Sequence, residues 1–525
     1  MLKKHQKISL CKLNKIKILE GFWKDRLDVF GKVTIADTLD KFEKDRGGAI
    51  NNFKRVRDGK SGFHAGPPWF TGLIGECIRG ISDFQIQEYS KEIDERLDAY
   101  IELIAQAQDA SGDGYLSAYT TLMCPEFRLG RNGGNILWQH DVYNSGCIVE
   151  AGVHHYFSTG KTSMLEIACK LANYYVREIG PEPRENIVPD HALPEEAYLK
   201  LYSLFAENPE IKNQLKTQVN EIEYLNLVKF WLDMRGVHHN RKSYPRYLGE
   251  YSQDHVLLAD QTEAVGHAVR AALLYAGMAE YVNITGDEKY AAAARRIWEN
   301  ITRRKLHITA NIGAVHSEEK FGWEYQLPNS AYLETCAGAA MLFFAKNMFV
   351  REGQSEYMDL LEMSLYNGVL PGISLSGNKW FYENPLSSNG EIKRWDWHVC
   401  PCCPPMFLKV MGELPSYIYA TCGGSVYVNM YIPSEASIAL KDGTLEIIQK
   451  TTFPWSGNVS LTVKSAPQGK TRILLRIPSW AESAELKINK AAVDALKKDG
   501  WFIVEREWKA SDNIDLLLEM KPVLM

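Results

Sequence analysis

Two adjacent cysteines stand directly before two prolines in the segment HVCPCCPPMF, residues 398–407. Proline is favoured in the first turn of a helix, so we expect Cys402 and Cys403 at a helix start. A second segment, NSAYLETCAGAAMLFF (329–344), places Glu334 and Cys336 where another helix begins. Residues two apart do not share a helix face, so these two can act together only in a loose N-terminal turn.

One carboxylate and three thiols form a suitable tetrahedral donor set for Zn²⁺: Glu334, Cys336, Cys402 and Cys403. The spacing is not that of a zinc finger, and other interpretations stay open. Cys336 could be a small core residue in an Ala-rich helix, and Cys402 and Cys403 could form a vicinal disulfide, which is unusual in a reducing compartment. A zinc-bound thiol at a helix N-terminus is a thiolate near neutral pH, able to act as a ligand or as a nucleophile.

A nucleophile needs a proton donor for its leaving group. The nearby segment VHSEEKFGWEYQLPNS (315–330) carries Glu318, Glu319 and Glu324 among aromatic residues. Partial desolvation there would raise a carboxyl pKa towards the range of a general acid. The alternative is a solvated charged loop, and this chemistry alone does not choose among the three.

The elements that must position these residues are helical up to about residue 420. Three segments read as helix, glycine turn and helix, with turns at Gly160, Gly286 and Gly353, and a weaker relative places Gly80 in the same role. The turns at Gly160, Gly286 and Gly353 are 126 and 67 residues apart, so the period is about 63 to 67 residues if one turn between the first two carries no such glycine. That period is too long for common helical solenoids and fits hairpins with sizeable loops. We expect pairs near 64–107, 138–178, 193–236, 261–303 and 331–369, with a sixth joining the helix after Pro405 to one around 25–57. Six such hairpins predict an (α/α)6 barrel, and an open helical array is the alternative.

The pattern of polar and apolar residues changes in the final hundred or so residues. Seven runs alternate polar and apolar residues in period two: GSVYVNMYI, TLEIIQKTTF, NVSLTVKSA, TRILLRIPSW, AELKIN, GWFIVEREW and NIDLLLEM. They predict an antiparallel β-sandwich of about seven or eight strands. The fold class is therefore mainly α, with a catalytic barrel over 1–421 and a sandwich over 422–525. The first 15 or so residues are expected to pack on the sandwich.

Composition and charge limit the binding partners and the cellular compartment that we expect for this protein. The net charge of -5 gives no electrostatic reason to expect nucleic acid or an anionic membrane. The N-terminus is basic but lacks the apolar run of a signal peptide, and we expect a cytoplasmic protein without a transmembrane helix. In that compartment we expect its ten cysteines to be buried thiols, ligands or a nucleophile rather than a disulfide framework. The oligomeric state stays open, a homodimer included.

Several motifs resemble those of the bacterial β-L-arabinofuranosidases of glycoside hydrolase family 127. The most specific matches are EKF, YQLPN and YLETCA between residues 319 and 337, together with CCPP at 402–405. Further matches are ILWQHDVYNSG, PDHALPEEAYLKLY, EAVGHAVRAALLY, FYENPLSS and LRIPSW, so the similarity covers nearly the whole chain. Met406 departs from the family, which usually has Asn after the two prolines.

The resemblance implies an (α/α)6 barrel followed by β-sandwich domains. It also implies zinc held by Glu334, Cys336, Cys402 and Cys403, with Cys402 as nucleophile and Glu319 as general acid/base. His140, His191, His267 and Tyr382 match positions that line the family's sugar pocket. The expected substrate is an oligosaccharide or other glycoside, and the expected reaction is retaining removal of terminal β-L-arabinofuranose or a related sugar.

Two other functions fit the same fold. A sugar epimerase or unsaturated-uronyl hydrolase would share the barrel but would use His or Asp and need no cysteine cluster. A non-catalytic carbohydrate-binding protein could keep zinc as a structural ion.

Overall fold

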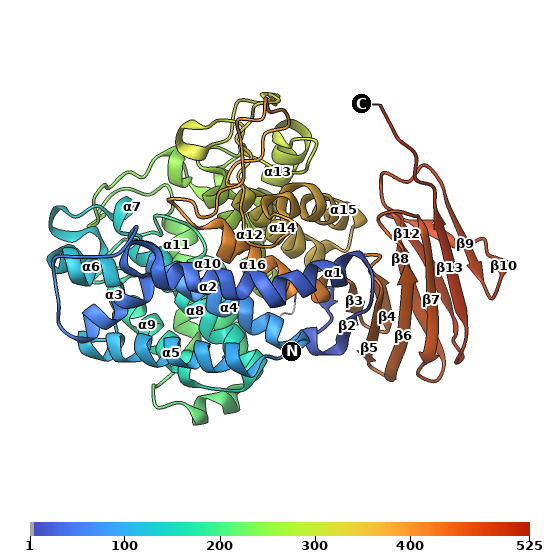
Figure 1. The fold of residues 1–525 in the computed structure, drawn as a ribbon, viewed down its shortest axis with the longest axis horizontal. Helices are drawn as coiled ribbons and strands as arrows, with labels where there is room; N and C mark the ends of the chain where they lie inside the picture. Colours follow the sequence, from blue (N-terminus) through green and yellow to red (C-terminus); the bar gives the residue numbers. More distant parts are fainter. Residues whose placement is uncertain (1–4, 525) are drawn as a thin grey trace.

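A computed structural model describes residues 5–524 as a helical barrel followed by a β-sandwich (Figure 1). Six helices form a closed inner ring in which each contacts its two neighbours. In order around the ring they are α4 (Phe70–Gln87), α8 (Asp141–Thr159), α10 (Pro194–Glu207), α12 (Ala268–Thr285), α14 (Thr335–Glu352) and α16 (Cys403–Glu413). The ring confirms the predicted (α/α)6 barrel.

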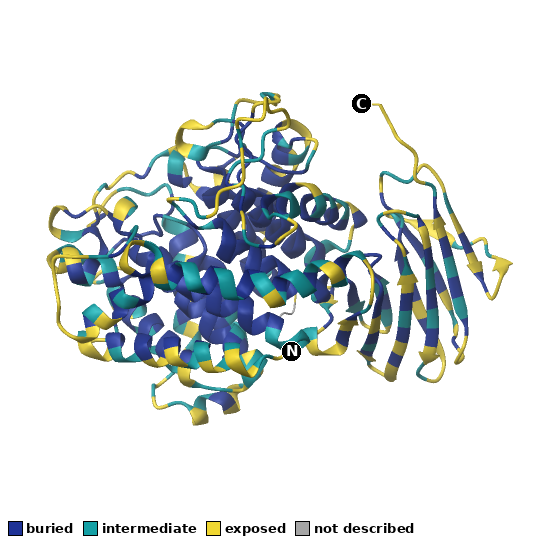
Figure 2. Ribbon diagram, viewed as in Figure 1, coloured by how far each residue is buried: buried dark blue, intermediate teal, exposed yellow. Residues whose placement is uncertain are grey.

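Outer helices follow the inner ones and cover them. They are α5 (Lys91–Ser111), α9 (Ser163–Glu178), α11 (Glu221–Met234), α13 (Glu288–Asn300) and α15 (Ser355–Met363), with α1 (Phe22–Val29), α2 (Ile35–Lys44) and α3 (Ala49–Arg57) on the sixth side. The inner helices are buried along nearly their whole length, whereas the outer helices expose one polar face (Figure 2). An all-round apolar helix needs such a cover, which is why the hairpin is the repeating unit.

The turn glycines have the predicted role at three positions. Gly160, Gly286 and Gly353 end α8, α12 and α14 in the left-handed conformation, with φ of 71°, 73° and 78°. The prediction for Gly80 is wrong, because this residue lies inside α4. A Cβ there would come within 2.5 Å of the Leu408 carbonyl carbon, so Gly80 permits close packing of α4 on α16.

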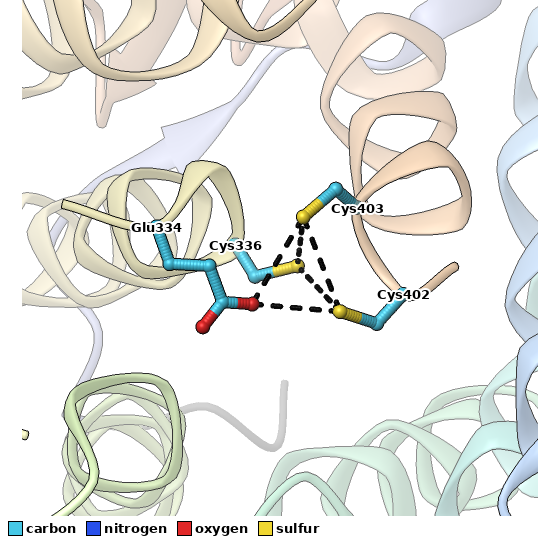
Figure 3. A group of neighbouring side chains, drawn as sticks. All are labelled: Glu334, Cys336, Cys402 and Cys403. Atoms are coloured by element: carbon cyan, nitrogen blue, oxygen red, sulfur yellow. Dashed lines mark hydrogen bonds between the residues drawn. The ribbon is translucent and has the colours of Figure 1, made fainter. Parts of the chain in front are cut away.

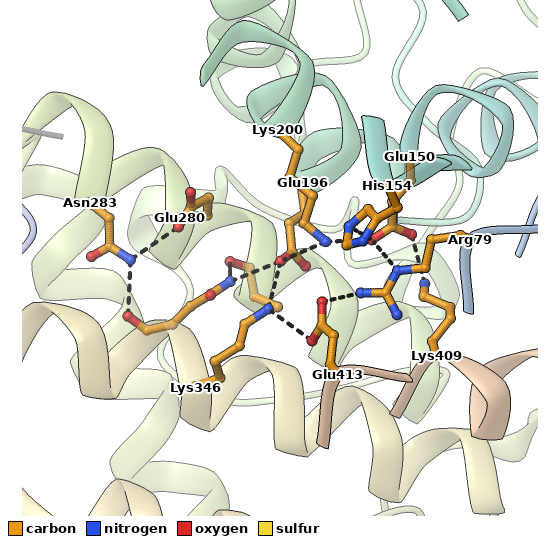
Figure 4. A network of polar contacts seen from close by, with 12 residues as sticks. Arg79, Glu150, His154, Glu196, Lys200, Glu280, Asn283, Lys346, Lys409 and Glu413 are labelled. Carbon is orange, nitrogen blue, oxygen red and sulfur yellow. Dashed lines mark hydrogen bonds and ion pairs between the residues drawn. The ribbon is translucent and has the colours of Figure 1, made fainter. Parts of the chain in front are cut away.

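Charged side chains of the inner helices meet inside the barrel (Figure 4). Arg79 of α4 pairs with Glu413 of α16 and lies 3.6 Å from Glu150 of α8. Lys346 of α14 reaches Glu196 of α10 at 3.3 Å, two helices away around the ring. The network therefore crosses the barrel interior, with acids and bases paired away from water.

The C-terminal region is a sandwich of two sheets. The first has the order β1 (Ser9–Leu10), β3 (Tyr419–Cys422), β4 (Ser425–Val428), β8 (Lys470–Arg476), β12 (Trp501–Glu507) and β11 (Leu496–Lys498). The second has the order β10 (Ala491–Ala492), β9 (Ala484–Ile488), β13 (Asn513–Leu518), β7 (Asn458–Ser465), β6 (Gly443–Thr451), β5 (Ser434–Leu440) and β2 (Ile16–Ile18). All pairings are antiparallel except that of β4 with β8.

The N-terminal segment adds a strand to each sheet. β1 pairs with β3, and β2 pairs with β5. The backbone N–H of Ile8 also donates to the carbonyl of Val350 in α14 at 2.9 Å, so the segment ties the sandwich to the barrel. Within residues 5–524, none of the helices combines the length and apolar character needed to cross a bilayer.

Candidate active site

Glu334, Cys336, Cys402 and Cys403 converge where two neighbouring inner helices begin (Figure 3). Glu334 is the N-cap of α14 with extended backbone angles, which frees its side chain from the helical periodicity that separates residues two apart. Cys402 is the N-cap of α16, and the two prolines follow in its first turn. The predicted helix starts therefore bring the four side chains together.

The distances within this group match those of a tetrahedral zinc site. The Sγ atom of Cys336 lies 3.5 Å from that of Cys402 and 3.4 Å from that of Cys403, and the other two sulfurs are 4.0 Å apart. Glu334 Oε1 lies 3.4 and 3.9 Å from Cys402 and Cys403 Sγ. Zinc–sulfur bonds of about 2.3 Å in a tetrahedron imply sulfur separations of about 3.8 Å.

The electrostatics of this group also fit a cation. Glu334 Oε2 is buried and has no hydrogen-bond partner among the described residues. Burial raises the pKa values of both Glu334 and Cys336 well above their usual range, so ionising them together requires a positive charge at the centre. All ten cysteines lie within the described residues, where all of them are free thiols.

Glu319 is the member of the three candidate glutamates that faces this group. Its Oε2 accepts from His267 Nε2 at 2.6 Å, and its Oε1 accepts from the hydroxyls of Tyr332 at 2.8 Å and Tyr382 at 3.1 Å. Burial raises the pKa of Glu319, but these three donors outweigh it and hold the pKa at about 2. The carboxylate form is therefore the one that this arrangement favours.

The other two glutamates lie in different surroundings. The side chain of Glu318 is 57% exposed and pairs with Lys320, whereas Glu324 pairs with Arg304 and Asn300. Glu318 and Glu319 both have left-handed backbones, with φ of 61° and 54°. Such angles cost about 1–3 kcal/mol each in residues other than glycine. Bridges from Lys320 to His267 and Val315 hold this strained turn against the site.

Tyr382 links the carboxylate to the thiols. Its hydroxyl lies 3.1 Å from Glu319 Oε1 and 3.6 Å from Cys402 Sγ. Glu319 Oε1 and Cys402 Sγ are thus no more than about 7 Å apart. For comparison, the two carboxyl groups of a retaining glycosidase are about 5–5.5 Å apart. A carboxylate and a thiol that share one hydroxyl neighbour can act on the same bound molecule.

The three predicted histidines extend from Glu319 as a series of rings. The ring of His267 lies 5.8 Å from that of His191, which lies 6.0 Å from that of His140. Burial lowers the pKa of all three, so the rings are neutral near pH 7. His267 accepts the backbone N–H of Arg270 at Nδ1, which leaves its proton on Nε2 for Glu319. The structure thus joins every predicted site residue into one contiguous group.

Two residues of this group were missed from the sequence. Asp190 is fully buried, and neither of its carboxylate oxygens accepts a hydrogen bond from the described residues; His140 Nδ1 is 3.6 Å away. Arg270 lies over the ring of Tyr251, 4.5 Å from its centroid, and 3.5 Å from His140 Nε2. In the sequence, only their positions point to a role in the site. Asp190 directly precedes His191, and Arg270 follows His267 by three residues.

Comparisons with known proteins place the chain in a family. Residues 15–416 match the GH127 catalytic domain of β-L-arabinofuranosidases, and residues 425–520 match the GH127 middle domain. The chain is 32% identical over 465 residues to a non-reducing end β-L-arabinofuranosidase of Bifidobacterium longum subsp. longum, a match that covers 81% of this chain. It covers 66% of that relative, just under two thirds of its length.

Solved structures agree. A GH127 β-arabinofuranosidase superimposes with a TM-score of 0.89 at 33% identity, covering 98% of this chain and 81% of the other. A GH127 β-L-arabinofuranosidase from Geobacillus stearothermophilus T6 gives a TM-score of 0.87 at 31% identity, covering 96% and 82%. The chain therefore belongs to the GH127 β-L-arabinofuranosidases, a family of glycoside hydrolases.

Proposed function

We propose that this protein removes terminal β-L-arabinofuranose, or a closely related sugar, from a glycoside with retention of anomeric configuration. Cys402 is the nucleophile and Glu319 the general acid/base. The observation that carries the proposal is the position of both groups against the Tyr382 hydroxyl, at 3.6 and 3.1 Å. The activity named for the curated relative supports the choice of sugar.

The donor set of Glu334, Cys336, Cys402 and Cys403 suits Zn²⁺ better than a harder cation, because three of its four donors are thiols. Glu334, Cys336, Cys402 and Cys403 would hold the ion. When bound, the ion would keep these thiols deprotonated. Side chains of the protein carry out every step of the reaction that is described below.

In the first half of the reaction, Cys402 Sγ attacks the anomeric carbon, and the bond to the glycosidic oxygen breaks. That oxygen takes a proton from Glu319, and a thioglycosyl enzyme forms. Glu319 must be protonated at this stage. A bound sugar excludes water and favours protonation, because desolvation disfavours the carboxylate.

In the second half, Glu319 acts as a carboxylate, the form stabilised by His267, Tyr332 and Tyr382. It removes a proton from the attacking water, the carbon–sulfur bond breaks, and the sugar leaves. The neutral rings of His140 and His191, with His267 and Tyr382, bind the sugar hydroxyls in the pocket. The cytoplasmic location and the homodimer stay predictions.

The test is hydrolysis of an aryl β-L-arabinofuranoside, with the anomer of the first product followed by NMR. We expect the retained anomer, about one zinc per chain, and loss of turnover in both Cys402→Ser and Glu319→Gln. Glu319→Gln should keep both the metal and the thermal unfolding midpoint, which separates catalysis from folding. Glu318 is the exposed neighbour of Glu319 in the chain, so Glu318→Gln is the matched control and should keep full turnover.

Other outcomes are equally informative. Full activity in Cys402→Ser would rule out that nucleophile, and an inverted product would rule out the covalent route. Sugar binding and zinc content without turnover on any aryl furanoside would favour a non-catalytic binding protein. Chelation should lower the unfolding midpoint and expose three further thiols to a thiol reagent, a readout that does not depend on activity.

A further inference from the structure

Glu334 differs from most metal ligands in what orients its side chain. A ligating carboxylate is usually held by hydrogen bonds from neighbouring groups. Glu334 Oε1 faces the thiols of Cys402 and Cys403, whereas Oε2 points away from them and has no hydrogen-bond partner among the described residues (Figure 3). The position of this carboxylate therefore depends on the backbone that carries it.

That backbone makes a strained turn just before helix α14. Leu333 is buried and has a left-handed conformation, with φ of 48°. A residue other than glycine keeps such an angle only where its surroundings hold it there. Glu334 follows with ψ of 140°, outside the helical range, which lets it face the same point as Cys336 two residues later. The turn must therefore be held in place if Glu334 is to meet the thiols.

One carboxamide holds the two peptide groups that flank the Cα atom of Glu334. Asn311 Nδ2 donates to the carbonyls of Leu333 and Glu334, at 3.2 Å each. The first carbonyl belongs to the peptide before this Cα atom and the second to the peptide after it. Because each peptide group is planar, the two bonds together restrain φ and ψ of Glu334. Asn311 is itself fully buried, and its Oδ1 accepts the backbone N–H of Ile312 at 2.8 Å.

A second carboxamide supports the same turn. Asn384 Nδ2 donates to the Leu333 carbonyl and to Oγ1 of Thr335, at 3.0 Å each. The backbone N–H of Thr335 also donates to the carbonyl of Tyr382 at 3.0 Å. Asn384 therefore joins the turn to the segment of Tyr382, the residue that lies between the proposed acid/base and the proposed nucleophile.

We propose that Asn311 is a positioning residue that pre-organises Glu334 for the metal ion. Asn384 completes the restraint, and these two residues together are called the carboxamide clamp. The proposal rests on the metal site of the proposed function and deepens it. A ligand that is already held in its bound position loses less freedom when the ion binds, so the clamp raises the affinity for Zn²⁺.

Removing one carboxamide should not unfold the protein. Without Asn311, both carbonyls that it binds keep another donor: Asn384 Nδ2 for the first, and the backbone N–H of Ala337, at 3.0 Å, for the second. The N–H of Ile312 loses its acceptor, so we expect Asn311→Leu to fold with a lower unfolding midpoint. Asn384→Leu is the milder variant, because Asn384 Oδ1 has no hydrogen-bond partner among the described residues.

Asn347 provides a matched control at the other end of the same helix. It is 3% exposed, and its Nδ2 donates to the carbonyl of Ala276 at 2.9 Å. It is therefore also a buried carboxamide that binds a backbone carbonyl, but it lies about three helical turns beyond Cys336. Asn347→Leu should lower the unfolding midpoint and leave the metal site intact.

The experiment measures the affinity of the full-length protein for Zn²⁺ by competition with a chromophoric chelator, and the unfolding midpoint of the metal-free protein. We expect Asn311→Leu to weaken zinc binding about tenfold and Asn384→Leu severalfold. Asn347→Leu should leave the affinity unchanged. Unchanged affinity in folded Asn311→Leu would overturn the clamp, as would an equal loss of affinity in Asn347→Leu. If Asn311→Leu does not fold, the affinity of Asn384→Leu decides in the same way.

Failure of the proposed function gives a different result. If the wild-type protein binds zinc but cleaves no arabinofuranoside, the proposed function fails, and the clamp is still judged by the zinc affinities of the variants. If the wild-type protein binds no zinc, the clamp is overturned, whatever the protein hydrolyses.

Discussion

His267 donates a hydrogen bond from Nε2 to Oε2 of Glu319 over 2.6 Å. The proton is on Nε2 because Nδ1 accepts the backbone N–H of Arg270 at the start of α12. The helix start therefore sets the tautomer of His267, and through it the charge state of the proposed acid/base. The Tyr332 and Tyr382 hydroxyls stabilise the same carboxylate from its other oxygen.

Replacing His267 with Phe keeps a ring but removes this donor. Because the donor stabilises the ionised carboxylate, its loss should raise the pKa of Glu319. A hydrogen bond to a charged group contributes about 1.5–3 kcal/mol, which corresponds to roughly one to two pH units. The protonated form serves the first half of the reaction, so the alkaline limb of kcat/KM should move to higher pH while kcat falls.

The pH dependence of kcat/KM for an arabinofuranoside tests this prediction. His316→Phe is the control, since the ring of His316 contacts Tyr332 at 5.3 Å but does not bond to Glu319. It should leave the limb in place. An alkaline limb in His267→Phe that stays put or moves to lower pH would show that His267 does not set the protonation of Glu319.

Much of this site could be anticipated from local sequence. Prolines after Cys403 and the run of small residues after Cys336 mark two helix starts, and alternate helices of a closed barrel of hairpins start at the same end. The choice of Glu319 over Glu318 and Glu324 needed the family resemblance, because it depends on which carboxylate meets His267 and Tyr382. Those contacts join segments 52 or more residues apart along the chain.

Other features left no pattern in the sequence. Strands β1 and β2 span two and three residues, too short to show period-two alternation. Gly80 resembles a turn glycine by its neighbours, but it lies inside α4, where it packs against Leu408 of the adjacent inner helix α16. Asp190 looks like an ordinary loop aspartate until the fold buries it beside His140. In each case the deciding partner is remote in sequence.

Asp190 predicts an unusual dependence of stability on pH. Burial raises its pKa from 3.8 to about 7, against a smaller lowering by Arg270. A carboxyl whose pKa is raised by folding stabilises the protein in its protonated form. This contribution is complete below about pH 4 and is lost as the pH rises through about 7. Asp190→Asn keeps the neutral shape, so it should raise the unfolding midpoint at pH 8 relative to wild type and change it little at pH 4.

Asp254 is a matched aspartate with the opposite behaviour. It is equally buried, but its carboxylate accepts hydrogen bonds from Arg241 and from the backbone N–H groups of Gly236 and Leu248. Despite burial, these partners lower its pKa, so Asp254→Asn should reduce stability at pH 8. Thermal unfolding of both variants at the two pH values provides the comparison. A loss of stability in Asp190→Asn at pH 8 would mean that its carboxylate is paired after all.

The charge network across the barrel predicts a large effect from a residue outside the active site. Arg79 is 1% exposed and faces Glu413, Glu150 and Asp83. Arg79→Met keeps an unbranched chain but leaves these buried acids short of a partner. Removing one member of a buried ion pair typically costs about 3–5 kcal/mol, because the other charge stays desolvated. We expect a fall of that size in the free energy of unfolding of the barrel at pH 7.

Urea unfolding followed by circular dichroism at 222 nm measures this fall, since the helical signal comes from the barrel. Arg472→Met in the sandwich is the control. Arg472 pairs with Glu505 on the surface, where both side chains are close to half exposed, and such pairs contribute about 1 kcal/mol or less. The loss in Arg79→Met should shrink as the pH falls towards 4, because protonation neutralises the stranded acids. A loss no larger than that of Arg472→Met would show that the interior network does not stabilise the barrel.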